Sequence, residues 1–330
     1  MTNVQSFEIK DFTFDNGTTL PSAKLCYLDL NPEKSKTALV ITCFRGRLQQ
    51  TLNFADGALG DHRVIVVALF GNGESSSPSN SDFPDSLRYA DCVRAQKELL
   101  TSHLGLESVD VVLGFSMGGQ CTYHWSVMYP DFVRNAVIIC SSARTSNHNY
   151  QFLEGPKAAL ENAADYVDKS LITNSSEPSR GVHAFGKAYS AWLTSAEWFN
   201  QELYKSLGYE TLEAWDHDIT FKGYTGWDPE DLLAKLRMWQ AGDIATVVPS
   251  GEKTLEAALS SIKARVLLMP CLTDQYFRPD ANEREARLIP SATLEVIPSV
   301  WGHVAGGGAN PADASWMDHK IRVFLGRSVI

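Results

Sequence analysis

A serine in a glycine-rich turn is the residue of this chain best suited to nucleophilic chemistry. Ser116 is the centre of Gly114-Phe115-Ser116-Met117-Gly118-Gly119, which fits the pattern G-x-S-x-G. The segment lies directly between an apolar run at 109–113 and a helical pattern at 120–129, so it predicts a tight strand-to-helix turn. Glycines leave room around the serine, and the N-terminus of the following helix favours developing negative charge. Ser116 is therefore predicted to be a nucleophile.

A serine hydroxyl needs a base that takes its proton, and the base needs an acid that orients it. With this motif the chain order is serine, acid, histidine. His303 is the candidate base because it follows a late predicted strand in a loop, where neighbouring glycines let an exposed imidazole approach the serine. Asp274, just past the predicted strand 264–270, is the candidate acid. Asp280 and Glu283 are competitors, but a helix beginning near Asp280 carries them away.

The negative oxygen that forms during acyl transfer requires two hydrogen-bond donors. The backbone N–H of Met117, next after the nucleophile, is one candidate, and that of Phe44, at the end of the predicted strand 38–44, is the other. Cys43 and Arg45 share this loop and are assigned to the substrate pocket; Arg45 either faces a substrate carboxylate or is a solvated loop arginine. Because no His, Cys or carboxylate cluster has metal-ligand spacing, we expect neither a metal nor a bound cofactor.

These residues require a sheet that presents them at one edge. Apolar, β-rich runs occur at 7–14, 23–30, 38–44, 63–70, 109–113, 136–140, 264–270 and 293–298. Several are nearly continuous in apolar residues, as strands buried on both faces are. Helical patterns at 87–104, 120–129 and 313–325 alternate with the strands or close the chain. We therefore predict an α/β fold with a mostly parallel, eight-stranded sheet flanked by helices, and with the site at the carboxyl ends of the strands.

Residues 145–262 have a different character, because aromatic residues cluster there and no clear strand pattern appears. We interpret this segment as a helical lid, inserted between two core segments at 1–144 and 263–330. Most of its tryptophans are expected to form the core of the lid. Trp192 and Trp227 are assigned to the substrate pocket.

The composition restricts the partners. With 330 residues, 44% of them hydrophobic, the chain can bury a large core as one or two domains. Its 29 basic and 39 acidic residues give a net charge of −10, which disfavours nucleic acid and anionic membranes. No apolar run approaches the roughly 20 residues of a membrane span, and the N-terminus lacks the pattern of a signal peptide. Six cysteines without CxxC spacing fit reduced thiols, so we expect a cytoplasmic protein with a small-molecule substrate.

Together the motifs resemble the α/β-hydrolase superfamily, and within it the homoserine O-acetyltransferase-like branch, over nearly the full length. The similar segments are 114–120 with Trp125 and Tyr129-Pro130, Gly71-Asn72-Gly73 with Ser75-Ser76-Ser77-Pro78, Trp227-Asp228-Pro229, Thr273-Asp274 with Phe277-Arg278-Pro279, and Gly302-His303. The resemblance implies the α/β-hydrolase fold, a triad of Ser116, Asp274 and His303, a helical lid, an acyl-serine intermediate, and a homodimer joined through the lid.

Two departures from this branch bear on the substrate. The loop 42–46 lacks the histidine with which the family's loop starts, and Tyr189 is followed by Ser190 where the transferases carry an arginine that grips the amino-acid carboxylate. Both differences argue against homoserine. The chain is similar in this respect to divergent members from fungal secondary-metabolite clusters.

The predicted function is hydrolysis, through an acyl-enzyme, of an ester or thioester of a small apolar or specialised metabolite. An alternative is transfer of the acyl group to an alcohol, with acyl-CoA as the co-substrate that supplies it. The two reactions differ in whether the lid excludes water. A non-hydrolytic step such as carbon–carbon bond cleavage on the same fold is another. A binding module with an idle triad is disfavoured, because Ser116, Asp274 and His303 are all present.

Overall fold

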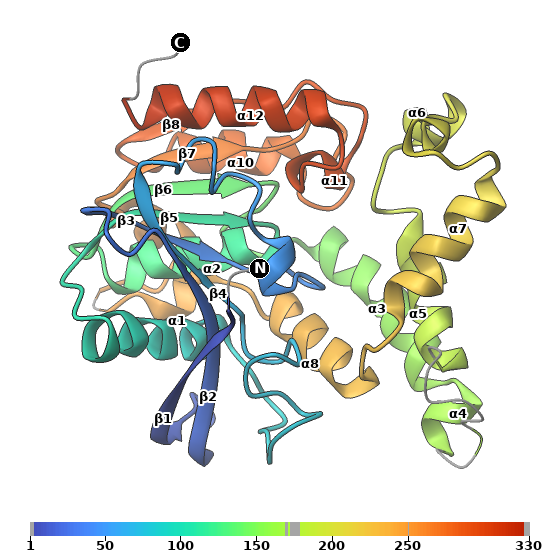
Figure 1. Ribbon diagram of the computed structural model, residues 1–330, viewed down its shortest axis with the longest axis horizontal. Helices are drawn as coiled ribbons and strands as arrows, with labels where there is room; N and C mark the ends of the chain where they lie inside the picture. Colours follow the sequence, from blue (N-terminus) through green and yellow to red (C-terminus); the bar gives the residue numbers. More distant parts are fainter. Residues whose placement is uncertain (1–2, 169–170, 172–178, 250, 327–330) are drawn as a thin grey trace.

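One eight-stranded sheet runs through the computed structural model, which describes residues 3–168, 171, 179–249 and 251–326 (Figure 1). The strands are β1 (Gln5–Thr13), β2 (Thr19–Leu30), β3 (Lys36–Ile41), β4 (His62–Val67), β5 (Val109–Phe115), β6 (Val133–Ile139), β7 (Arg265–Met269) and β8 (Ala292–Leu294). Their order is β1-β2-β4-β3-β5-β6-β7-β8. The pairs β1–β2 and β2–β4 are antiparallel and all the others are parallel, so the predicted mostly parallel sheet is confirmed.

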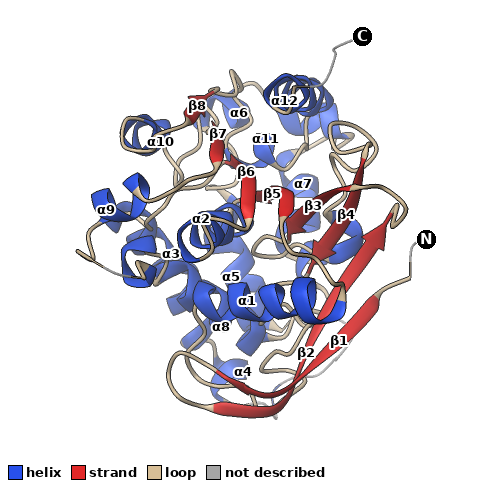
Figure 2. Cartoon of the chain, turned by 90° about the vertical axis from the view of Figure 1, so that its left-hand side faces the viewer, coloured by secondary structure: helices blue, strands red, loops and turns tan. Residues whose placement is uncertain are grey.

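Helices flank both faces of this sheet (Figures 1 and 2). The α-helices are α1 (Tyr89–Glu98), α2 (Met117–Met128), α3 (Asn147–Glu161), α4 (Ala164–Val167), α5 (Arg180–Ser190), α6 (Ala196–Asn200), α7 (Leu212–Thr220), α8 (Pro229–Gln240), α9 (Leu255–Ser260), α10 (Pro279–Ala286), α11 (His303–Gly306) and α12 (Pro311–Phe324). A π-helical turn, Leu99–His103, extends α1, and short 3-10 turns lie at Leu48–Gln50, Leu203–Leu207, Lys222–Tyr224 and Ile244–Val247.

The apolar strands of the sheet centre are buried on both faces. Along β3, Leu39 and Ile41 belong to one hydrophobic cluster, shared with α1, α2 and α8, whereas Val40 belongs to a second cluster, shared with α12. This alternation follows from the period of two in a strand. It explains why the central runs are continuously apolar in the sequence.

The described part of 145–262 is helical, with no strand apart from an isolated bridge between Arg144 and Asp243. Helices α3, α5, α6 and α7 stand together to one side of the sheet (Figure 1). Helix α8 contributes the fully buried Leu232, Leu233 and Leu236 to the hydrophobic cluster that covers one sheet face, and α3 and α5 contribute to the same cluster. The domain boundaries at 145 and 262 stay a prediction.

Several elements begin or end elsewhere than predicted, and α2 and β8 are two examples. Helix α2 begins at Met117, three positions before the predicted start at 120, because Ser116 already occupies its N-cap position. Strand β8 ends at Leu294; beyond it, the N–H of Glu295 donates to the carbonyl oxygen of Leu268, and Ile297 forms an isolated bridge to Cys271. Among the described residues, no helix has the length and apolar character needed to cross a membrane.

Candidate active site

Ser116 lies at the turn between β5 and α2 in a conformation that side chains rarely adopt, with φ 58° and ψ −125°. Its neighbours hold it there: its N–H donates to the carbonyl oxygen of Ile139 at 2.9 Å, and its own carbonyl accepts from Ser141 Oγ at 2.7 Å. A Cβ on Gly118 would lie 2.4 Å from the carbonyl oxygen of Ile41, so only glycine fits. Such held strain is common at functional sites and presents the side chain at the end of the strand.

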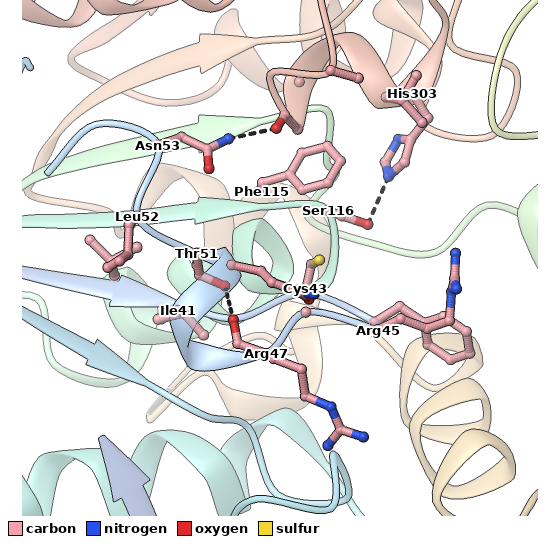
Figure 3. A pocket seen from close by; sticks show the side chains of 18 of the residues that line it. Ile41, Cys43, Arg45, Arg47, Thr51, Leu52, Asn53, Phe115, Ser116 and His303 are labelled. Carbon is pink, nitrogen blue, oxygen red and sulfur yellow. Dashed lines mark hydrogen bonds between the residues drawn. The ribbon is translucent and has the colours of Figure 1, made fainter. Parts of the chain in front are cut away.

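His303 connects Ser116 to Asp274. Its Nε2 lies 2.9 Å from Ser116 Oγ, and its Nδ1 lies 2.7 Å from Asp274 Oδ2 (Figure 3 shows the first contact). A carboxylate only accepts hydrogen bonds, so Nδ1 carries the imidazole proton and Nε2 is free to accept from the serine hydroxyl. All three residues are buried, with relative exposures of 2%, 4% and 2% for Ser116, His303 and Asp274.

Asp274 follows β7, as predicted, and its second oxygen is held by the backbone. Oδ1 accepts the N–H groups of Tyr276 at 3.1 Å and Phe277 at 3.0 Å. The competitor Asp280 lies in α10 and pairs with Arg284 at 2.7 Å, and Glu283 is exposed on the same helix. The structure therefore brings Ser116, His303 and Asp274 together and leaves both competitors apart.

The expectation that His303 is an exposed loop residue is wrong. His303 begins the one-turn helix α11, and its ring lies against Phe115 at 4.7 Å, Tyr276 at 4.3 Å and Phe277 at 5.6 Å between centroids. The glycine before it, Gly302, has φ 60°, and a Cβ there would lie 2.6 Å from the backbone of Thr194, which belongs to the predicted lid. Aromatic rings and the backbone of Thr194 thus bury most of the imidazole.

The two predicted oxyanion donors, Phe44 and Met117, lie just past the ends of the neighbouring strands β3 and β5. Strands β3 and β5 pair in parallel with Ile41 opposite Gly114, so the chain leaves both strands at the same edge of the sheet. Met117 is the first residue of α2, where an N–H has no partner within the helix. In the described part of the chain, the N–H of Phe44 donates to no acceptor either. Both groups are free to donate to a substrate oxygen.

A cavity of about 680 Å³ opens beside Ser116 and His303. Of the predicted pocket residues, Cys43, Arg45 and Trp227 line it, as does Phe44. Trp192 is not among the lining residues; its indole packs against Phe152 at 4.6 Å and His148 at 5.4 Å. An apolar part of the wall contains Leu52, Phe54, Ala55, Leu59, Val64 and Leu113. In Figure 3, Leu52 and Arg45 lie on opposite sides of Ser116.

The charged side chains that line the cavity, other than His303, are all cationic: Arg45, Arg47 and Lys222. The Arg45 guanidinium donates to the carbonyl of Gly223 at 2.8 Å and lies over the ring of Tyr224. Lys222 pairs with Asp218, whereas neither arginine forms an ion pair with any residue that the structure describes. This part of the wall is therefore suited to an anionic group.

Sequence reasoning missed two features of the site. The ring of Tyr276 packs on the His303 imidazole, and Lys235 of α8 donates from Nζ to the carbonyl oxygen of Cys43 at 3.0 Å. Lys235 lies three positions after the buried Leu232 and four before the buried Trp239, on the same face of the helix. A lysine within an apolar stripe was the available signal for this contact.

The donor set does not favour a metal ion. Among the described residues, Cys140 offers a sulfur within 4.8 Å of ligand atoms of Asp274 and His303. Both nitrogens of His303 already have partners, in Ser116 and Asp274. Burial raises the pKa of the Cys140 thiol well above its ordinary value, which disfavours the thiolate that a metal needs. These groups suit proton transfer better than coordination.

Comparison with known proteins finds relatives that share the alpha/beta hydrolase fold. A family model described as "alpha/beta hydrolase fold" matches residues 42–306. An ethyl acetate hydrolase from Pseudomonas veronii is 33% identical over 300 residues, which cover 88% of this chain and 84% of that protein. The solved structure of the acetyl esterase MekB is 30% identical, with a TM-score of 0.89 over 98% of this chain and 97% of the other.

Transferases are also among the relatives. A homoserine O-succinyltransferase from Halothiobacillus neapolitanus is 26% identical, and the match covers 88% of this chain and 82% of that protein. Esterases and O-acyltransferases are two of the kinds of enzyme that the sequence predicts.

Proposed function

We propose that this chain, which belongs to the alpha/beta hydrolase fold family, is a carboxylester hydrolase that forms an acyl-enzyme on Ser116. Its esterase and O-acyltransferase relatives identify it as an enzyme of this general kind. One observation carries the proposal. The hydrogen-bonded series Asp274, His303, Ser116 ends in the wall of a cavity, with a serine conformation that is held by its neighbours.

In the first half-reaction, Ser116 Oγ attacks the ester carbonyl carbon while His303 Nε2 takes the hydroxyl proton. Asp274 stabilises the resulting imidazolium and does not itself take the proton. The carbonyl electrons move to oxygen, and this oxyanion accepts the N–H groups of Met117 and Phe44. When the tetrahedral intermediate collapses, the imidazolium gives its proton to the leaving alcohol.

In the second half-reaction, water takes the place of the alcohol. His303 removes a proton from the water, whose oxygen attacks the acyl carbon. Collapse of this second intermediate breaks the bond to Ser116 Oγ, which recovers its proton from His303. The products are one carboxylic acid and one alcohol, and the enzyme returns to its starting state.

Two observations support hydrolysis of a small ester rather than transfer to homoserine. The ethyl acetate hydrolase has the higher identity of the relatives described above, at 33% against 26% for the succinyltransferase. Ser190, at the position where the resemblance places an arginine in the transferases, turns its hydroxyl to the carbonyl of Lys187. It therefore offers no charge to an amino-acid carboxylate.

Acyl transfer is a second candidate because of the cationic part of the cavity wall. Arg45 and Arg47 form no ion pair with any described residue and line the cavity that contains Ser116. An acyl-CoA or a dicarboxylic acyl group carries negative charge that these side chains attract. In this case the acyl-enzyme gives its acyl group to an alcohol in place of water.

Turnover of a chain-length series of 4-nitrophenyl esters, together with ethyl acetate, tests the proposal. We expect hydrolysis that prefers short acyl chains and disappears in Ser116→Ala. Ser126→Ala is the matched control, because Ser126 is buried in the same helix and its hydroxyl donates to the carbonyl of Thr122. Hydrolysis by Ser116→Ala at the wild-type rate contradicts the proposal. Added alcohols that accelerate release of 4-nitrophenol and yield acylated alcohol favour the transferase instead.

Further predictions concern the partners of the chain. We propose that its substrate is a small molecule, that it needs no metal or bound cofactor, and that it forms a homodimer through the lid. Sedimentation velocity tests the homodimer, and hydrolysis measured after treatment with a chelator tests whether a metal is needed.

A further inference from the structure

A buried lysine contacts the loop that follows β3. Lys235 of α8 is fully buried, and its Nζ donates to the carbonyl oxygen of Cys43 at 3.0 Å. Within the described chain it forms no ion pair. A buried charge without a counter-ion costs folding free energy, and an apolar residue of similar volume avoids this cost. The contact with Cys43 therefore needs a reason other than stability.

The carbonyl that Lys235 contacts belongs to the same peptide group as the N–H of Phe44. All the described peptide bonds are trans, so this N–H points opposite to the Cys43 carbonyl. The N–H of Gly46 also donates to that carbonyl, at 3.3 Å. The Phe44 ring is held by stacking on Tyr189, at 5.6 Å between centroids. The peptide is thus fixed from its carbonyl end and from the side chain that follows it.

We propose that Lys235 is a positioning residue that orients and polarises the Cys43–Phe44 peptide, so that the N–H of Phe44 is a stronger donor to the oxyanion. This inference rests on the proposed function, in which Phe44 supplies one of the two oxyanion donors. A cation on the carbonyl side draws electrons from the peptide and strengthens the hydrogen bond on the N–H side. The effect is greatest where negative charge develops, so it stabilises the transition state more than the bound substrate.

The size of the effect follows from the distance between the charges. The peptide unit and two hydrogen bonds place the ammonium roughly 8 Å from the oxyanion. At an effective dielectric constant of about 20, a unit charge at this distance changes kcat by about 30-fold, or ~2 kcal/mol at 1.36 kcal/mol per tenfold. KM changes little, because the neutral ester carbonyl gains much less from the charge.

Among Lys235 and the thiols close to it, Lys235 is the group that changes its charge near neutral pH. Burial lowers the pKa of Lys235 to about 8, and the positive charge of the nearby Arg47 also lowers it. Burial raises the pKa of the nearby thiols of Cys43, Cys92 and Cys121, so these thiols stay neutral at that pH and do not balance the charge of Lys235. The ammonium is therefore present below about pH 8 and is lost above it.

The test compares Lys235→Met with wild type in hydrolysis of 4-nitrophenyl acetate. We expect kcat to fall about 30-fold with KM within twofold, and the inhibition constant of butylboronic acid, which forms an anionic adduct on the serine, to rise by a similar factor. The matched control is Leu236→Met, a change of similar volume at the next, fully buried position of α8. It is expected to keep the wild-type kcat.

The pH profile of kcat gives a readout that packing alone does not change. Wild type is expected to lose activity with a midpoint near pH 8 while its circular dichroism stays constant, and Lys235→Met is expected to lack this decrease. If the variant does not fold, the wild-type profile decides, and constant kcat up to pH 9.5 overturns the inference. A folded Lys235→Met with wild-type kcat and boronate inhibition also overturns it. In both of these outcomes the wild type still hydrolyses the ester through Ser116, so only the role of Lys235 is refuted. If the wild type shows no Ser116-dependent hydrolysis, the proposed function itself is refuted.

Discussion

Replacing Asp274 by asparagine tests the predicted roles of the three hydrogen-bonded residues in the most discriminating way. The native carboxylate accepts on both oxygens, from His303 Nδ1 at 2.7 Å and from the backbone N–H groups of Tyr276 and Phe277. In Asp274→Asn, one side of the amide is an oxygen and the other is an NH2 group. Because the two backbone donors need an acceptor, we expect the oxygen to face them and the NH2 to face the imidazole.

This orientation reverses the imidazole tautomer. The NH2 group of the asparagine donates to His303 Nδ1, so the imidazole proton moves to Nε2. Nε2 then cannot take the proton of Ser116, which lies 2.9 Å away. A wrong tautomer in this arrangement costs about 10⁴-fold in kcat, or ~5.4 kcal/mol. The backbone hydrogen bonds are kept, so the unfolding free energy changes by less than about 1 kcal/mol.

The assay is hydrolysis of 4-nitrophenyl acetate near neutral pH, with urea unfolding of the same preparations. Asp280→Asn is the control, because Asp280 is half exposed and forms its ion pairs, among the described residues, with Arg278 and Arg284. We expect it to keep wild-type activity. Activity of Asp274→Asn within tenfold of wild type, or a large loss in Asp280→Asn, refutes the assignment of the acid.

Three further predictions concern stability and specificity. Gly118→Ala places a Cβ 2.4 Å from the backbone oxygen of Ile41, so urea unfolding is expected to show a loss of about 1–3 kcal/mol; an unchanged midpoint is inconsistent with this contact. Burial raises the pKa of Glu285 to about 7 from 4.5, although Tyr123 donates to it. The protonated carboxyl of Glu285 therefore contributes its full stabilisation below pH 4.5, and this stabilisation is lost as pH rises through 7. We expect the unfolding free energy of the wild type to fall by roughly 3 kcal/mol between these pH values, and that of Glu285→Gln to lack this fall, when unfolding is measured at a series of pH values. Arg45→Ala is expected to raise KM for the anionic 4-nitrophenyl succinate about fivefold and to leave KM for the neutral acetate unchanged; equal effects on both esters exclude a charge-specific contact.

Local patterns predicted the elements that carry the site. The continuous apolar runs of the central strands, and the glycines around Ser116, reflect constraints that act within a few residues. The order of Ser116, Asp274 and His303 along the chain then sufficed to place them at one edge of the sheet. Asp280 was set aside for the reason that the structure shows, since α10 begins at Pro279.

Features that depend on packing between distant segments could not be predicted in this way. The burial of His303 results from Tyr276, Phe277 and the backbone of Thr194, which approaches Gly302, and none of these residues is close to His303 in the sequence. The sequence predicts Trp192 to line the pocket, but its indole packs on Phe152 of α3 instead. Whether an aromatic residue faces core or cavity is decided by tertiary contacts rather than by its local sequence.

Labelling with a fluorophosphonate, followed by intact-protein mass spectrometry, tests the nucleophilic role of Ser116 most directly. Wild type and Ser116→Ala are incubated with the reagent under the same conditions, and circular dichroism verifies that both are folded. We expect wild type to gain the mass of one phosphonyl group and the variant to gain none. Unlabelled wild type, or a variant that is labelled to the same extent, contradicts an activated Ser116 and with it the acyl-enzyme mechanism.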